Sequence, residues 1–188
     1  MAPFDSTLRA ARLRESHLRD NRGMPVSADA LRSHLDYTAW ASHRIVDAAA
    51  KLSPEELSHD FQTADRTILN TLVHTYVADR LWLARMQHEP QRPPTDADRS
   101  LQVLETEWPA LMEHWNAWAA SLTDESAQAP LEYHDLRGNP WKQPVWQLIL
   151  HVVNHGTHHR GQASGFLRTL GHTPPVLDLV GYYREKGL

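Results

Sequence analysis

Four of the chain's 13 histidines fall in one short segment, at positions 151, 155, 158 and 159. On an α-helix of 3.6 residues per turn, these positions lie within an arc of roughly 100°, so their side chains leave one face. Two imidazoles at positions i and i+4 can bind the same metal ion. The segment therefore predicts a metal-binding helix. Spacing alone leaves two pairs open, His151 with His155 or His155 with His159.

A third ligand is expected from another helix, because one helix face offers two histidines to an ion. His74 shares a helical face with Val77, Ala78 and Leu81, which predicts that it points inward. Taken alone, such a residue is interpreted as a core histidine bonded to a carbonyl or hydroxyl. The corresponding alternative for the cluster at 151–159 is a solvated, histidine-rich face. Three neutral imidazoles with an open fourth position are instead typical of catalytic sites.

The elements that must position these histidines are long amphipathic helices. Their apolar spacing, with a serine cap at Ser27 and a glycine stop at Gly171, predicts an all-α fold, a four-helix bundle. A short hairpin or flap centred on residues 138–140 is expected just before the last long helix. We divide the chain into an N-terminal extension, residues 1–26, and one bundle domain, residues 27–188. The long helices are expected at about 27–52, 67–88, 97–122 and 145–170.

The composition of the chain limits the partners and the metal ligands to be expected. The chain has 188 residues, 41% hydrophobic and 22% charged, with a formal net charge of −4. These values are ordinary for a soluble, single-domain protein, and no basic excess indicates a nucleic-acid partner. No apolar run approaches the roughly 20 residues that cross a bilayer, so we expect no membrane partner and a cytoplasmic location. The absence of cysteine leaves histidine and carboxylate as the strong transition-metal ligands.

Three segments together resemble the DinB/YfiT-like family of metalloenzymes: residues 148–162, 74–82 and 135–140. The pattern His-x-x-Asn-His-x-x-His-His-Arg-Gly-Gln is the specific part of the resemblance, which covers nearly everything after about residue 27. It implies a four-helix bundle that binds one divalent transition metal, commonly nickel or zinc. It assigns the three ligands to His74, His155 and His159, and it implies a homodimer.

The same resemblance implies an activity, thiol-dependent S-transfer or isomerisation on a small-molecule substrate, with a low-molecular-weight thiol supplying the sulfur. Two alternatives are a non-catalytic metal-binding protein of the stress response and a metal-dependent hydrolase. A zincin carries a glutamate directly after its first histidine, whereas Gly156 follows His155 in this chain, which weakens the hydrolase hypothesis. For Arg160, a salt bridge to Asp79 is favoured over a role as an anion clamp.

Overall fold

The computed structural model describes residues 26–188, so almost all of the predicted N-terminal extension lies outside the described residues. The elements in chain order are α2 (Ala28–Ala49), α3 (Pro54–Leu57), α4 (Ile68–Met86), η1 (Asp96–Asp98), α5 (Leu101–Ala120), α6 (Asp124–Gln128), β1 (Pro130–His134), β2 (Pro140–Pro144), α7 (Val145–Thr169) and α8 (Leu179–Lys186). The prediction of an all-α fold is confirmed, with one small two-stranded sheet as an addition.

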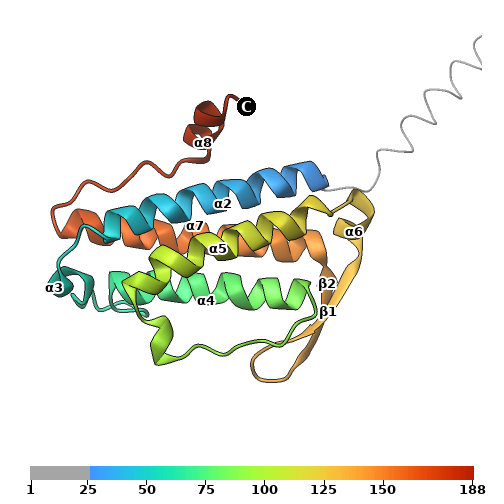
Figure 1. Cartoon of the computed structure of the whole chain (residues 1–188), viewed down its shortest axis with the longest axis horizontal. Coiled ribbons are helices and arrows are strands. Elements are labelled where there is room, and N and C mark those ends of the chain that lie inside the picture. The colour runs from blue at the N-terminus through green and yellow to red at the C-terminus, as the bar shows by residue number, and fades with distance from the viewer. Residues whose placement is uncertain (1–25) are drawn as a thin grey trace, which may run out of the picture.

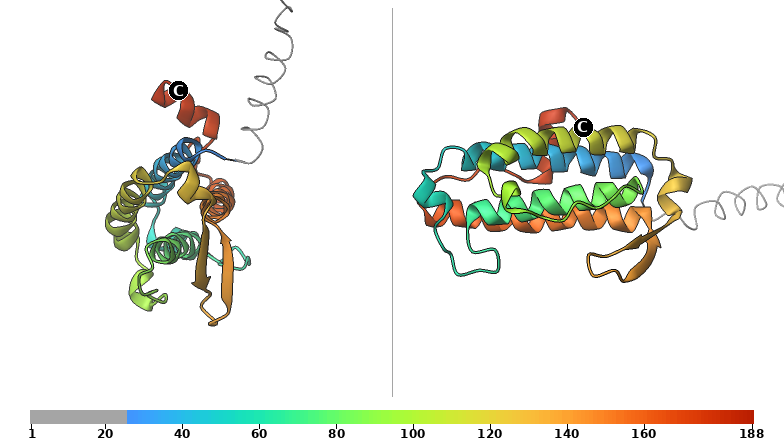
Figure 2. Two further views of the ribbon diagram at one scale, coloured as in Figure 1. Left: turned by 90° about the vertical axis from the view of Figure 1, so that its right-hand side faces the viewer. Right: turned by 60° about the horizontal axis from the view of Figure 1, so that its bottom comes forward.

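Four long helices, α2, α4, α5 and α7, form the bundle (Figure 1). Helices α2 and α4 each pack against both α5 and α7, and the end-on view shows the four arranged around a common core (Figure 2). Helix α8 lies outside the bundle, next to α2. No helix among residues 26–188 has both the length and the apolar character needed to cross a membrane.

The helix ends follow the local signals in the sequence. The Ser27 hydroxyl accepts a hydrogen bond from the Ala30 amide and caps α2, while Ser53 and Glu56 form a reciprocal capping box at α3. Gly171, directly after the C-cap of α7, has a φ of +86°, in the left-handed region that glycine adopts without strain. Predicted and observed ends of α7 agree within one residue.

The third long helix begins later than predicted, at Leu101 rather than near residue 97. Residues 96–98 instead form η1, because Asp98 turns inward and is only 2% exposed. Its carboxylate accepts hydrogen bonds from Arg80 at 2.6 Å and Arg92 at 2.6 Å. The bond from Arg80 of α4 ties the crossover between α4 and α5 to the bundle, and the bond from Arg92 lies within the crossover.

The predicted hairpin is also present. Strands β1 and β2 pair antiparallel, with Leu131 opposite Gln143 and Tyr133 opposite Trp141. Tyr133 packs edge-on against Trp82 of α4, with ring centroids 5.2 Å apart. The hairpin is therefore attached to the face of the bundle where α4 and α7 meet, and it leads directly into α7 (Figure 1).

The core is built from the apolar faces of the four helices and includes two tryptophans of α5. Trp108 and Trp115 are each 1% exposed, as expected of core packing. Their indole nitrogens both donate to one residue of α4: Trp108 Nε1 to the Asp79 carboxylate at 3.0 Å, and Trp115 Nε1 to the Asp79 carbonyl at 3.1 Å. A buried polar centre thus joins α4 to α5.

Candidate metal centre

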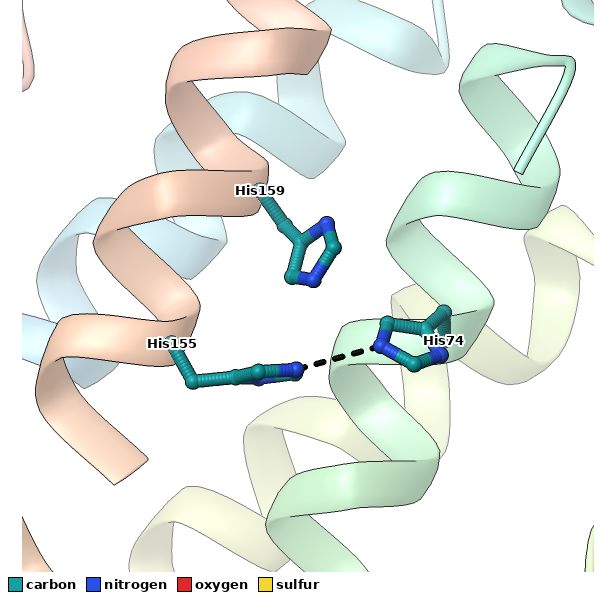
Figure 3. Close-up of side chains that lie close together, drawn as sticks. All are labelled: His74, His155 and His159. Carbon is teal, nitrogen blue, oxygen red and sulfur yellow. Dashed lines mark hydrogen bonds between the residues drawn. The ribbon is translucent and has the colours of Figure 1, made fainter. Parts of the chain in front are cut away.

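Three histidines converge between α4 and α7 (Figure 3). His155 and His159 lie one turn apart on α7 and point toward His74 on α4. One ring nitrogen from each lies within 4.8 Å of the other two, and Nε2 of His74 is 3.1 Å from Nε2 of His155. Four donors around a tetrahedral zinc at about 2.05 Å would lie about 3.3 Å apart. The three imidazoles therefore form a group that could hold a metal ion.

The structure separates the two pairs that spacing left open. His155 and His159 join His74, whereas His151 is outside the group and stacks edge-on against Trp82, with ring centroids 5.3 Å apart. His158 is exposed and also outside the group. Which pair meets the third histidine depends on where α4 crosses α7, which no spacing within α7 encodes.

The prediction that His74 points into the core is wrong. Its side chain is exposed, although its neighbours Val73 and Val77 are each 7% exposed. The reason is that His74 lies at the edge of the α4–α7 contact rather than at the bundle axis, and its polar partner is His155 rather than a core carbonyl or hydroxyl. An accessible histidine at this edge can exchange a ligand with solvent.

Two residues that sequence reasoning did not assign support His159. Its Nδ1 lies 2.7 Å from Oε1 of Gln162, and because that oxygen can only accept, the contact favours the tautomer with the proton on Nδ1. The Asp65 carboxylate, from the loop before α4, lies 3.6 Å from the same nitrogen. Metal-binding histidines characteristically donate their second N–H to a carbonyl or carboxylate, which fixes the tautomer and leaves the other nitrogen free. Gln162 follows His159 by three residues, a spacing that could have indicated it.

Electrostatics favour the neutral form of two of these histidines, His155 and His159. Burial, reinforced by the neighbouring His159 and His74, lowers the pKa of His155 to about 3. Burial also lowers the pKa of His159, although the bond to Gln162 acts in the opposite direction. Both imidazoles are therefore unprotonated at neutral pH, the form in which histidine binds a metal. The donor set, its convergence and its protonation state all fit a divalent transition metal.

A cavity of about 510 Å³ lies beside one of the three histidines, His74. Asp65, the carboxylate near His159, also lines it. Asn70 and Val73 of α4 line one side, and the crossover around η1 closes the other. A space of this size accommodates a small metabolite.

Arg160 is 1% exposed, which leaves no surface for an external anion and excludes the anion clamp. The favoured salt bridge to Asp79 is not formed within residues 26–188 either, because the hydrogen bonds of Arg160 go to Ser42 at 3.2 Å and Thr157 at 3.3 Å. Asp79 attracts Arg160 electrostatically but accepts its hydrogen bond from Trp108. Burial raises the pKa of Asp79 to about 7, against the opposing effects of Trp108 and Arg160.

Comparison with known proteins supports the same family as the motif. The chain is 26% identical over 153 residues to Protein DinB of Bacillus subtilis (strain 168), covering 76% of this chain and 87% of that protein. A crystal structure of a DinB-like protein from Bacillus cereus ATCC 10987 superposes with a TM-score of 0.61 at 18% identity, covering 80% of this chain and 97% of that one. The family model described as the DinB family matches residues 24–187. The chain belongs to the DinB family.

Proposed function

We propose that this protein binds one divalent transition metal, nickel or zinc, through His74, His155 and His159, and that the loaded protein is an enzyme of thiol-dependent S-transfer or isomerisation. One observation carries the proposal: three imidazoles from two helices converge on one point, and one of them, His74, lines a cavity. Within the described residues 26–188, no fourth histidine or carboxylate completes that group. Three protein ligands and an open position are the pattern of catalytic rather than structural zinc.

The chain's own residues would hold the ion in a defined way. His159 presents one nitrogen inward because Gln162 and Asp65 engage the other. His155 presents Nε2 from the preceding turn, and His74 presents Nε2 from α4. A divalent ion at this point would supply Lewis acidity, which makes a thiol nucleophilic at neutral pH.

The cavity is the proposed binding place for the small-molecule substrate. It adjoins His74, so a reactant inside it would lie next to one of the residues that would hold the metal. The edge position of His74 gives both reactants a route from solvent. The chain contains no cysteine, so the sulfur has to come from a low-molecular-weight thiol.

The cavity also bears on the two alternatives. A non-catalytic metal-binding protein of the stress response would share all three ligands, but it would have no need for a substrate-sized space beside them. A hydrolase would need a general base. Asp65 is the carboxylate nearest to the group, and it already lies against His159. Thiol chemistry, which requires no such base, fits this site better.

Metal content tests the site. Protein purified without an affinity tag should carry about one divalent ion per chain, and His155→Ala should lose most of it because two donors remain. His158→Ala is the matched control: it removes an exposed imidazole of the same helix, outside the group, and should retain the metal. Equal metal content in His155→Ala and the parent would rule out the proposed ligands.

Activity tests the chemistry separately. Consumption of a small electrophile should require both a low-molecular-weight thiol and the metal, and a chelator should abolish it. Metal binding without any thiol-dependent turnover across a panel of thiols would favour the non-catalytic alternative. Turnover of an ester or amide without thiol would favour the hydrolase.

Two further expectations stay predictions, the homodimer and the cytoplasmic location. The dimer is testable by light scattering on the full chain, with and without metal. A mass of twice 21.5 kDa would support it.

A further inference from the structure

Arg160 is the most deeply buried cation of the described chain, at 1% exposure. Its side chain bends back along α7 rather than projecting away from it. Nη2 donates to the Thr157 hydroxyl on the same helix, and Nη1 donates to the Ser42 hydroxyl on α2. The guanidinium carbon lies 5.6 Å from the ring centroid of Tyr37, also on α2.

Asp79 of α4 is also fully buried, but it makes no direct bond to Arg160. Among the described residues, Asp79 Oδ1 and Arg160 Nε both lack a hydrogen-bond partner. The direct link that the guanidinium makes from α7 to another helix is therefore the hydrogen bond to Ser42 of α2.

Gly156 makes this arrangement possible. A Cβ at position 156 would lie 2.6 Å from Nη1 of Arg160 and 3.3 Å from its Cζ, well inside van der Waals contact. Gly161 and Gly165 of the same helix differ, because a Cβ at either would meet nothing within 4 Å. A side chain at 156 would therefore displace the guanidinium from the place it occupies against the backbone.

The residues of this contact are the direct sequence neighbours of two histidines of the metal centre. Gly156 directly follows His155, and Arg160 directly follows His159, so the guanidinium packs along the single turn that separates the two histidines. The rotation of that turn decides whether both imidazoles face His74. Anchoring that turn to α2 holds the three nitrogens together before any metal arrives.

We propose that Arg160 is a positioning residue of the metal centre: by filling the space beside Gly156 and binding Ser42, it fixes the rotation of α7 that brings His155 and His159 to His74. The inference rests on the proposed metal site. It assigns Arg160 no contact with the metal or with substrate.

Three variants test this on the full-length protein. Arg160→Met keeps the bulk and removes the charge and hydrogen bonds, Ser42→Ala removes the α2 partner, and Gly156→Ala displaces the guanidinium without deleting it. Zn²⁺ affinity is measured by competition with a chromophoric chelator. The absorption spectrum of bound Co²⁺ reports the ligand geometry.

We expect about a tenfold loss of Zn²⁺ affinity in Arg160→Met, the lower end of the range for residues that orient metal ligands. Ser42→Ala and Gly156→Ala should also lower the affinity for Zn²⁺, and both should alter the Co²⁺ spectrum. If Arg160→Met does not fold, the other two variants decide the question.

Arg80→Met is the matched control. Arg80 also lies on a ligand-bearing helix and anchors a tertiary contact, but its partner is Asp98 in the crossover. It should reduce thermal stability and leave Zn²⁺ affinity and the Co²⁺ spectrum unchanged. Equal affinity loss in Arg80→Met would show that general destabilisation is responsible and would overturn the proposal.

The remaining outcomes separate the two claims. Parental affinity in folded Gly156→Ala and Ser42→Ala would refute the role of Arg160 while leaving the metal site intact. A parent protein that binds neither Zn²⁺ nor Co²⁺ would refute the metal site, and the positioning role with it.

Discussion

Replacing glycine by alanine at two positions of α7 should change stability in opposite directions. Alanine in a helix interior is worth up to about 1 kcal/mol over glycine, because glycine loses more backbone freedom on folding. Gly165 is exposed and a Cβ there meets no atom within 4 Å. Gly165→Ala should therefore stabilise the protein by about 0.5–1 kcal/mol.

Gly156→Ala has the same stabilising effect on the backbone, but the new methyl group has to move the guanidinium of Arg160. A flexible side chain usually moves at little expense, but this one is 1% exposed, and displacing it breaks at least the bond to Ser42. A hydrogen bond of a charged group contributes about 1.5–3 kcal/mol. The loss exceeds the gain, so Gly156→Ala should destabilise the protein by about 1 kcal/mol. For a chain of this length, 1 kcal/mol shifts Tm by about 2–4 °C.

Thermal unfolding of the metal-free protein in the presence of chelator measures both variants directly. Repeating Gly156→Ala in an Arg160→Ala background checks whether the guanidinium causes the destabilisation. Without the guanidinium, alanine at 156 should be neutral or stabilising. A Gly156→Ala protein stabilised as much as Gly165→Ala would refute the reasoning. So would an unchanged destabilisation in the Arg160→Ala background.

Two further predictions concern pH. Asp98→Asn should lower the free energy of unfolding by about 3 kcal/mol at pH 7, measured in urea, because it breaks a buried ion pair. Arg80 and the Thr95 amide lower the pKa of Asp98 to about 2. The stability difference from the parent should therefore shrink as the pH falls toward 2. His155, with a pKa lowered to about 3, takes up its proton at a lower pH in the folded chain than in the unfolded chain. The metal-free parent should therefore lose stability as the pH falls from about 6.5, and His155→Gln should lose less; equal slopes would contradict this.

Local signals predicted the fold because they act within a few residues. Apolar periodicity located the long helices, and Ser27 and Gly171 marked two of their ends. The start of α5 was missed because it depends on Asp98 meeting Arg80 and Arg92 across the crossover. No local pattern encodes that meeting.

At the candidate site, too, local spacing predicted some features, while others depended on contacts between distant segments. Spacing identified His155 and His159 as possible partners, but excluding His151 required the position of α4. The burial of His74 was misjudged because an apolar helical face does not say which of its edges borders solvent. Asp65 approaches His159 from a loop 94 residues earlier in the chain and carries no sequence signal for that contact.

Gly156 also explains why the likeness to a zincin helix fails at one position. In the His-Glu-x-x-His pattern, the residue after the first histidine carries the general base. Here that position faces the guanidinium of Arg160, and even a Cβ would collide with it. A glutamate cannot replace Gly156 while Arg160 keeps its place. The packing that aligns the two histidines therefore excludes the zincin base, and a proton acceptor for chemistry at this site has to come from a position other than 156.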